Sequence, residues 1–215
     1  MTRFFASAAL TALLVHQVLC EQIDEGQSLS GKIHYELRST PSKDGNKTIW
    51  LWSNEGKSDA KQLCQTEGWG NLEMHFAPDD NWIVVQDGGA SLGIRCRLFK
   101  REHGLAFREI EKPDLNAEAE ILALRTAGLP AEEMSDHRYI RCLAWSGDSK
   151  MILIKARGNG RVGKVGVGFD WIGIYHVQDG RFSDDLWAES GLIGRGRESR
   201  RLAQKVASSL WYNVL

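Results

Sequence analysis

The chain has 215 residues, of which 42% are hydrophobic, and its 27 lysines and arginines nearly balance its 28 aspartates and glutamates, for a net charge of −1. Proteins that bind nucleic acid usually carry an excess of basic residues, so this balance argues against a nucleic-acid partner. Residues 21–215 suffice for a single domain with a hydrophobic core.

Residues 1–20 have the layout of a secretory signal peptide. Arg3 precedes an apolar run over residues 4–15, and Cys20 is the last residue before a cleavage site at Glu21. The run is shorter than the roughly 20 residues of a membrane-spanning helix. We therefore expect an exported protein, periplasmic or secreted, with no membrane span; a retained N-terminal anchor and a lipoprotein are the alternatives.

Short runs rich in β-branched and aromatic residues, separated by Asp, Asn, Gly and Ser, continue from residue 28 to about residue 190. This pattern is typical of antiparallel sheets. The predicted strands are KIHYELRS (32–39), KTIWLWSN (47–54), LEMHFA (72–77), WIVVQD (82–87), IRCRLFKR (94–101), AFREI (106–110), YIRCLAWS (139–146), MILIKA (151–156) and WIGIYHV (171–177), with DLWA (185–188) as a weaker candidate.

Two stretches have helical patterns instead. The first, AEAEILALRTAGL (117–129), has Asp114 or Asn116 as its expected N-cap and Gly128 at its end. The second is the C-terminal segment 197–211, whose apolar residues recur at helical spacing.

The chain is internally similar. FAPDDNWIVVQ (76–86) aligns with WSGDSKMILIK (145–155). Farther along, RLFKREHGLAF (97–107) aligns with GIYHVQDGRF (173–182), and a fainter third copy is WLWSNEGKSDAKQL (50–63). The turn glycines of these three segments, in the same place of each, are Gly104, Gly180 and Gly56. The repeats are predicted to cover approximately residues 30–66, 70–112 and 138–190.

The turns APDDNW and SGDSKM resemble the S-P-D-G-K turn of TolB-like and WD-type β-propeller blades. The resemblance implies a mainly β fold of antiparallel, blade-like sheets. Closed propellers use 4 to 8 blades, whereas this chain has two clear units and a partial third. The expected fold is therefore an incomplete or open propeller-like arrangement with two short helices, with a β-sandwich as the alternative. Completion of one ring by two chains would make a homodimer.

The stretch RGNGRVGKVGVG (157–168) matches two phosphate-binding fingerprints, G-x-G-x-x-G and G-x-x-x-x-G-K. Both need a helix after the glycine turn, because the helix N-terminus binds the phosphate. The residues that follow are strand formers, and Val165 occupies the place of the P-loop Ser or Thr. We predict a glycine-rich connection between two strands, either solvated or in contact with an anionic ligand. The candidate contacts are Arg157, Arg161 and Lys164.

No signature of catalysis, cofactor binding or metal binding is present. There is no G-x-S-x-G elbow, and the histidines lack metal-ligand spacing. After signal-peptide removal Cys64, Cys96 and Cys142 remain, an odd number. Either Cys96 and Cys142 form a disulfide, or these thiols are free and buried. We expect no cofactor and no metal.

These observations predict a non-enzymatic, exported binding module for a protein or an extracellular polymer. The 8 tryptophans support this prediction, since Trp50 and Trp52 share one strand face and could form a platform for a sugar or a peptide; packing between sheets is the alternative role. The competing hypothesis is an exported hydrolase with acidic residues gathered in a cleft between blades. This hypothesis predicts that some of Asp79, Asp87, Asp148 and Asp170 approach one another.

Overall fold

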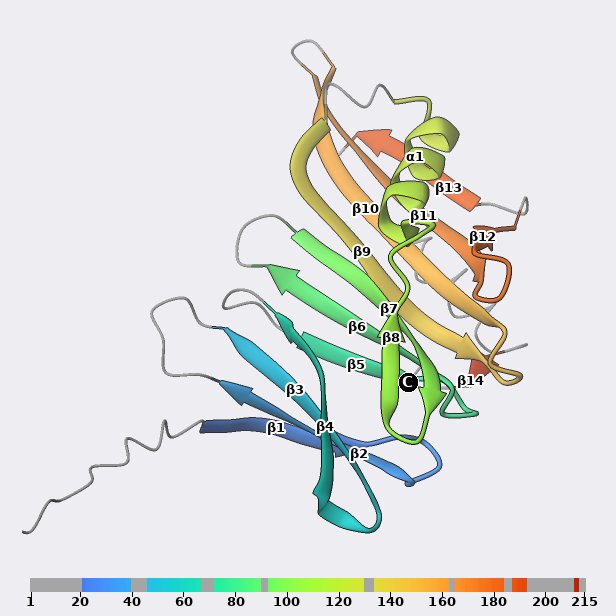
Figure 1. The fold of residues 1–215 in the computed structure, drawn as a ribbon. Coiled ribbons are helices and arrows are strands. Elements are labelled where there is room, and N and C mark those ends of the chain that lie inside the picture. The colour runs from blue at the N-terminus through green and yellow to red at the C-terminus, as the bar shows by residue number, and fades with distance from the viewer. Residues whose placement is uncertain are drawn as a thin grey trace, which may run out of the picture.

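A computed structural model describes residues 21–39, 46–66, 72–89, 93–129, 134–162, 165–183, 187–192 and 211–212 (Figure 1). The predicted signal peptide, residues 1–20, lies outside this range. The described chain is mainly β, as the sequence predicts, and forms two sheets and one helix.

The smaller sheet is an antiparallel meander in which each strand pairs with the next along the chain. Its strands are β1 (Glu21–Gln27), β2 (Ile33–Ser39), β3 (Lys47–Ser53) and β4 (Gly56–Thr66). This order places β1 and β4 at its two edges.

The larger sheet has ten strands, seven of which follow the order β12-β11-β10-β9-β7-β6-β5. They are β5 (Leu72–Phe76), β6 (Trp82–Gly89), β7 (Gly93–His103), β9 (Met134–Ser146), β10 (Met151–Val162), β11 (Val165–His176) and β12 (Arg181–Phe182). The other three pair beside this path: β8 (Ala106–Glu109) with β7, β13 (Trp187–Leu192) with β11, and β14 (Trp211–Tyr212) with β9. Over the described residues the sheet does not close on itself, because β5 ends the path unpaired on its outer side.

The larger sheet consists of two antiparallel meanders, β5 to β8 and β9 to β12, joined side by side. They meet where β7 pairs with β9 in parallel, at Gly93 with Arg138 and at Ile94 with Tyr139. Beyond this ladder the side chain of Asn116 takes over the pairing: its Oδ1 accepts from the Cys96 N–H (2.8 Å) and its Nδ2 donates to the Cys96 carbonyl (2.9 Å).

Helix α1 (Leu115–Ala127) confirms the first predicted helix. The Asp114 carboxylate accepts from the N–H groups of Asn116 and Ala117, and Gly128 ends the helix in the left-handed region with φ 66°. The second predicted helix, 197–211, falls outside the described residues except at Trp211, which lies in strand β14 and not in a helix. The structured part of the chain contains no helix with the length and apolar character needed to cross a membrane.

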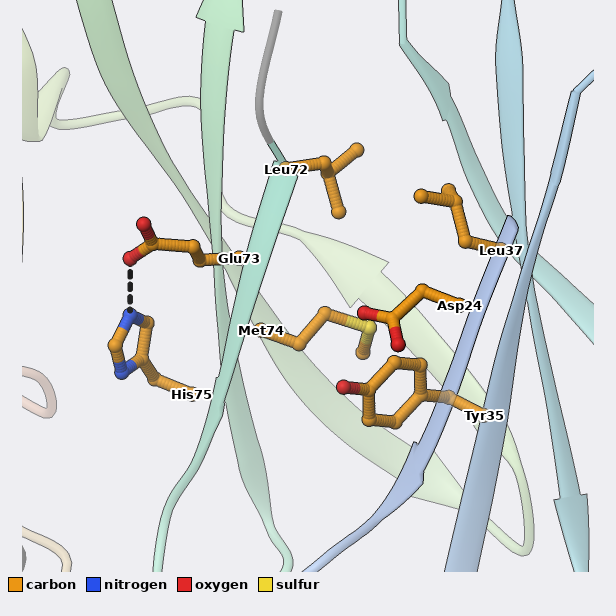
Figure 2. Close-up of a pocket in the computed structure, with 7 residues that line it drawn as sticks. All are labelled: Asp24, Tyr35, Leu37, Leu72, Glu73, Met74 and His75. Atoms are coloured by element: carbon orange, nitrogen blue, oxygen red, sulfur yellow. Dashed lines mark ion pairs between the residues drawn. The ribbon is translucent and has the colours of Figure 1, made fainter.

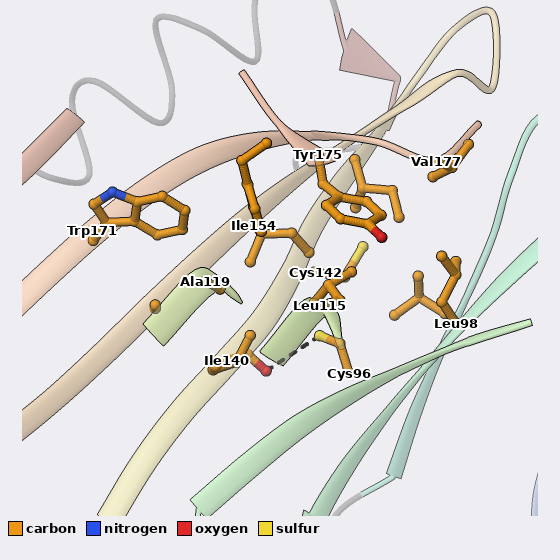
Figure 3. Close-up of a cluster of buried hydrophobic side chains, with 14 of the residues drawn as sticks. Cys96, Leu98, Leu115, Ala119, Ile140, Cys142, Ile154, Trp171, Tyr175 and Val177 are labelled. Atoms are coloured by element: carbon orange, nitrogen blue, oxygen red, sulfur yellow. Dashed lines mark hydrogen bonds between the residues drawn. The ribbon is translucent and has the colours of Figure 1, made fainter. Parts of the chain in front are cut away.

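Strand β6 separates two hydrophobic cores, because its side chains alternate between the faces of the sheet. Ile83 and Val85 pack against the smaller sheet, so this half of the molecule is a two-layer sandwich. Val84 faces the other core, which lies between the larger sheet and α1 (Figure 3). Trp171 and Tyr175 of β11 are its largest fully buried side chains.

Among the described residues, Cys64, Cys96 and Cys142 are buried and free. Cys96 and Cys142 belong to the core under α1 (Figure 3), where the Cys96 thiol donates to the Ile140 carbonyl at 3.3 Å. Burial raises the thiol pKa of Cys64 and of Cys96 to about 12, and that of Cys142 well above its ordinary value. Such thiols hold their protons at neutral pH, so none of the three is an activated nucleophile.

The first hairpin turn of each meander has the same conformation. Gly31, Asp80 and Ser149 all have positive φ, at 70°, 57° and 60°. In each turn this residue's N–H donates to the carbonyl three positions earlier, at 2.9 to 3.0 Å. The turns also touch: Ser30 Oγ donates to Asp80 Oδ2, and the Asp79 N–H donates to Ser149 Oγ (3.0 Å). The first turn, SLSGK at 28–32, is therefore a third copy of the repeated turn, which the sequence comparison missed.

Candidate binding site

The candidate loop at 157–168 is a paired hairpin and not an open connection. The ladder between β10 and β11 runs without a break from Met151 with His176 to Val162 with Val165. In this ladder Arg157, whose side chain is exposed, lies opposite Asp170, and Arg161 lies opposite Gly166. Lys164 lies outside the described residues. The structure therefore places the backbone of Arg157 and of Arg161 in strand β10, and contact of these cations with an anionic ligand stays a prediction.

The glycines of this hairpin make room for aromatic rings. A Cβ on Gly158 would lie 2.6 Å from the Phe169 ring, and one on Gly173 would lie 2.3 Å from the Trp171 ring. Phe169 covers Gly158 from the opposite strand and Trp171 covers Gly173 along the same strand, which explains why glycine stands at these two positions within a sheet. Aromatic packing thus accounts for Gly158 of the phosphate fingerprints, and strand β11, not a helix, follows them.

Of the four acidic residues named for the hydrolase hypothesis, two lie on neighbouring turns and two lie in strands. Asp79 and Asp148 lie on the two turns that touch through Ser149. Asp87 lies toward the far end of β6, and Asp170 lies within β11, where it pairs with Lys155 at 2.9 Å. Within the part of the chain that the structure describes, no group of three or more His, Cys, Asp or Glu side chains could hold a metal ion.

The tryptophans divide between core and surface. Trp82, Trp145 and Trp171 are buried. Trp50 and Trp52 are half-buried on the outer face of the smaller sheet, where the Arg38 guanidinium lies 5.1 Å from the Trp50 ring and Lys57 Nζ lies 4.6 Å from the Trp52 ring.

Glu36 holds these two cations in place. It is buried between them and forms ion pairs with both. Burial raises the pKa of Glu36, but the hydrogen bonds and charges of Lys57 and Arg38 outweigh it and lower the pKa below its ordinary value. On this face the two cations are therefore already in contact with a carboxylate and with the tryptophan rings.

The structure contains a cavity of about 300 Å³ on the open side of the sandwich, between the edge strands β1 and β5 (Figure 2). This volume is at the lower end of small-ligand sites. The cavity is lined by Asp24, Tyr35, Leu37, Leu72, Glu73, Met74 and His75. We call this feature the edge cleft.

One wall of the edge cleft is apolar. Leu72 and Met74 project from β5 toward Tyr35 and Leu37 of β2, with the Asp24 carboxylate beside them (Figure 2). Burial, and then the charge of Asp24, raise the pKa of Tyr35, so its hydroxyl stays protonated and can donate.

The opposite side of β5 is polar. Glu73 and His75 project away from the apolar wall (Figure 2), and Gln86 of β6 lies beside both. Gln86 Nε2 donates to Glu73 Oε2 and lies 2.8 Å from His75 Nε2. Burial lowers the pKa of His75, and Glu73, at 3.7 Å, opposes this shift only in part. His75 is therefore neutral at pH 7 and accepts from Gln86.

Strand β5 also presents backbone groups at the cleft. The Ala77 N–H donates to the Trp82 carbonyl at 2.9 Å, which makes these two a hydrogen-bonded pair of the antiparallel ladder. Such pairs alternate with pairs whose backbone groups point away from each other. Glu73 and His75 therefore direct theirs toward β6, while Leu72 and Met74 direct theirs toward the open edge.

The sequence pattern predicts β5 as the strand LEMHFA but assigns no binding role to its residues. The alternation of Leu72 and Met74 with Glu73 and His75 was the available signal, since it indicates a strand with one apolar and one polar face. The edge position carries no local signal, because it depends on strand order in the whole sheet.

No protein-family model matches the chain, and no curated protein matches its sequence. Among solved structures, the chain is similar to TolB from Acinetobacter baumannii, with a TM-score of 0.33 and 14% sequence identity over 81% of this chain and 44% of that chain. The chain thus spans less than half of that TolB chain. A TM-score of this size does not establish a common fold, so the description of the architecture rests on the strand pairing.

Proposed function

We propose that this protein is an exported, non-enzymatic binding module that captures an extended segment of another protein as an additional strand on β5. The carrying observation is the coincidence of a cavity of about 300 Å³ with a strand edge that no described strand covers. An added strand gains main-chain hydrogen bonds from the edge and specificity from a pocket for alternate side chains.

The chemistry of the edge cleft favours a polypeptide over the other predicted ligand, an extracellular polymer. Leu72 and Met74 offer N–H donors and carbonyl acceptors at strand spacing, which another backbone matches and a sugar chain does not. We also propose that the three meanders are blades of an incomplete propeller, with the cleft lying between its first and second blades.

Exposed strand edges usually invite aggregation, and natural proteins shorten or charge them. β5 has only five residues, and β1 carries Asp24 and Glu25. These devices limit uncontrolled pairing, and they leave room for a short, selected segment at β5.

The test is selection of linear peptides from a random display library on residues 21–215, followed by affinity measurement. Replacing alternate backbone N–H groups of a selected peptide with N-methyl groups should abolish binding, because the side chains stay while strand pairing is lost. Met74→Arg should also abolish binding by filling the cleft. Ile121→Arg, at an exposed apolar position on α1, is the matched control.

Selection of no peptide, or equal binding of the N-methylated peptide, would contradict the proposal. A third outcome is that β5 pairs with a second copy of this chain, and the mass of the purified protein in solution tests for it. A dimer that Met74→Arg converts to monomer, while Ile121→Arg does not, would show that β5 pairs with a second copy and not with another protein.

A further inference from the structure

We infer that the segment bound at the edge cleft alternates apolar residues with lysine or arginine. This inference rests on the proposed strand addition to β5, and it adds the chemical class of the partner. The two observations behind it are the two-faced character of β5 and an uncompensated negative charge at the cleft.

The geometry of a sheet fixes which side chains would meet. Residues opposite each other on neighbouring strands project to the same face, with Cβ atoms roughly 5 Å apart. A residue added opposite Met74 would therefore enter the apolar wall with Leu37 and Leu72. A residue added opposite Glu73 or His75 would project to the polar side.

The polar side offers a fixed carboxylate. The Glu73 side chain is 54% exposed, yet its Oε2 is held by Gln86, which is itself buried. A carboxylate held in place by a buried amide loses less freedom on pairing than a mobile one. A lysine or arginine opposite Glu73 meets a positioned acceptor.

Among the described residues, no lysine or arginine forms an ion pair with Asp24 or with Glu73. The group that lies beside Glu73 is His75, at 3.7 Å, and burial lowers the pKa of this histidine. By contrast, Glu36 and Glu109 are each paired with an arginine or lysine. The partner is therefore expected to supply the missing positive charge, and an acidic segment would be repelled.

The apolar wall sets the alternation. The part of the cavity that Leu37, Leu72 and Met74 enclose offers few hydrogen bonds, apart from the Tyr35 hydroxyl and Asp24 at its side. Burying an unpaired polar side chain there costs free energy. Apolar residues are thus favoured at every second position and basic residues between them.

The experiment compares synthetic peptides of about seven residues, long enough to span the five residues of β5. One alternates valine and lysine, a second alternates valine and glutamate, and a third alternates valine and serine. A fourth has the composition of the first in blocks, with valines together and lysines together. Binding to residues 21–215 is followed by fluorescence anisotropy at low and moderate salt.

The alternating valine–lysine peptide should bind at least about tenfold more tightly than the valine–glutamate peptide, and more tightly than the blocked one. Glu73→Gln should weaken valine–lysine binding about threefold, in line with one partly exposed ion pair, and leave valine–serine binding unchanged. Glu73→Lys should move the preference toward valine–glutamate. Glu111→Gln, at an exposed glutamate outside the cleft, is the control and should change nothing.

Equal affinity for the three alternating peptides, or equal affinity for the alternating and blocked peptides, overturns the inference while strand addition stands. Failure of every peptide to bind, the neutral valine–serine peptide included, overturns strand addition together with the inference. The reversal of preference in Glu73→Lys supports the inference independently of overall affinity, because this variant binds one peptide better and another worse.

Discussion

At the scale of single residues, the touching turns depend on backbone conformations that most side chains avoid. Asp80 is buried with φ 57°, in the place that glycine occupies in the first turn. Its carboxylate accepts from Ser30, which links the smaller sheet to the larger one. Aspartate tolerates the left-handed region better than most residues and supplies this link as well.

Replacement of Asp80 should therefore be costly in two separable ways. Asp80→Gly loses the hydrogen bond to Ser30 but fits the backbone, whereas Asp80→Ala loses the bond and strains the turn. We expect Asp80→Ala to be the less stable variant by about 1 kcal/mol, and both to be less stable than the native chain. Urea unfolding of the three proteins measures this order, and equal stabilities of the two variants would show that the turn does not constrain φ.

His75 should make stability depend on pH. Its pKa in the folded protein is below the unfolded value of 6.5 because of burial. Near and below pH 6.5 the unfolded state takes up the proton more readily, so the free energy of unfolding falls as the pH drops through 6.5 and levels off below the folded pKa. His75→Gln should flatten this slope, and His103→Gln, at an exposed histidine, should leave it intact. Identical slopes in the native chain and in His75→Gln would contradict the prediction.

At the scale of elements, sequence patterns predicted what depends on local chemistry. Helix α1 begins after Asp114 and ends at Gly128, which are typical N-cap and C-cap residues. The strands around Trp82 and Met151 also follow from their apolar runs. The turn at Gly31 was missed because Leu29 and Ser30 stand where the turn APDDN (77–81) has proline and aspartate. The hydrogen bonds that define the turn come from the backbone, so these side chains are not needed to form it.

Features that depend on distant partners could not be predicted in this way. Gly158 looks like part of a flexible loop until Phe169 is known to lie across from it. The edge cleft likewise requires β1 and β5 to end their sheets on the same side of the sandwich, which no local pattern encodes.

On the side of the sandwich opposite the edge cleft, Arg97 connects the two sheets. Arg97 of β7 donates through Nε and Nη2 to both carboxylate oxygens of Glu109 on β8, at 2.8 and 2.6 Å, and through Nη1 to the Gln65 carbonyl of β4 at 2.9 Å. This fork joins the two sheets on the side opposite the cleft, and lysine cannot reproduce it.

Arg97→Lys should destabilise the protein by about 1 to 3 kcal/mol, since a charge-assisted bidentate pair and a bond to a carbonyl are lost. Arg108→Lys alters the exposed pair with Glu102 and should change stability by less than about 0.5 kcal/mol. Thermal unfolding of the two variants provides the measurement. An Arg97→Lys variant as stable as Arg108→Lys would mean that the hydrophobic core holds the two sheets together without the contacts of Arg97.

At the scale of the whole molecule, the two meanders of the larger sheet are joined by a parallel ladder of only two residue pairs. Gly93 has φ 109°, and a Cβ there would lie 1.6 Å from the Arg138 carbonyl oxygen. Only glycine allows β9 to approach β7 so closely. The Asn116 side chain then secures the junction from the helix side.

Gly93→Ala should separate the two halves more than it unfolds either one. We expect a loss of more than about 2 kcal/mol and a second transition in urea unfolding, because the junction fails before the hairpins do. Gly104→Ala, at a turn glycine with open space around it, is the control and should keep a single transition. A single transition in Gly93→Ala, at native stability, would show that α1 holds the halves together without the ladder.

The parallel junction also has a consequence for how the chain acquires its structure. Hairpins such as β5–β6 and β10–β11 join residues close in sequence and can form early. The β7–β9 pair joins strands that are separated in sequence by β8 and α1, so its closure carries the entropy cost of a long loop for only two residue pairs. We therefore expect the meanders to form first and their docking at Gly93 to be the slower step of folding.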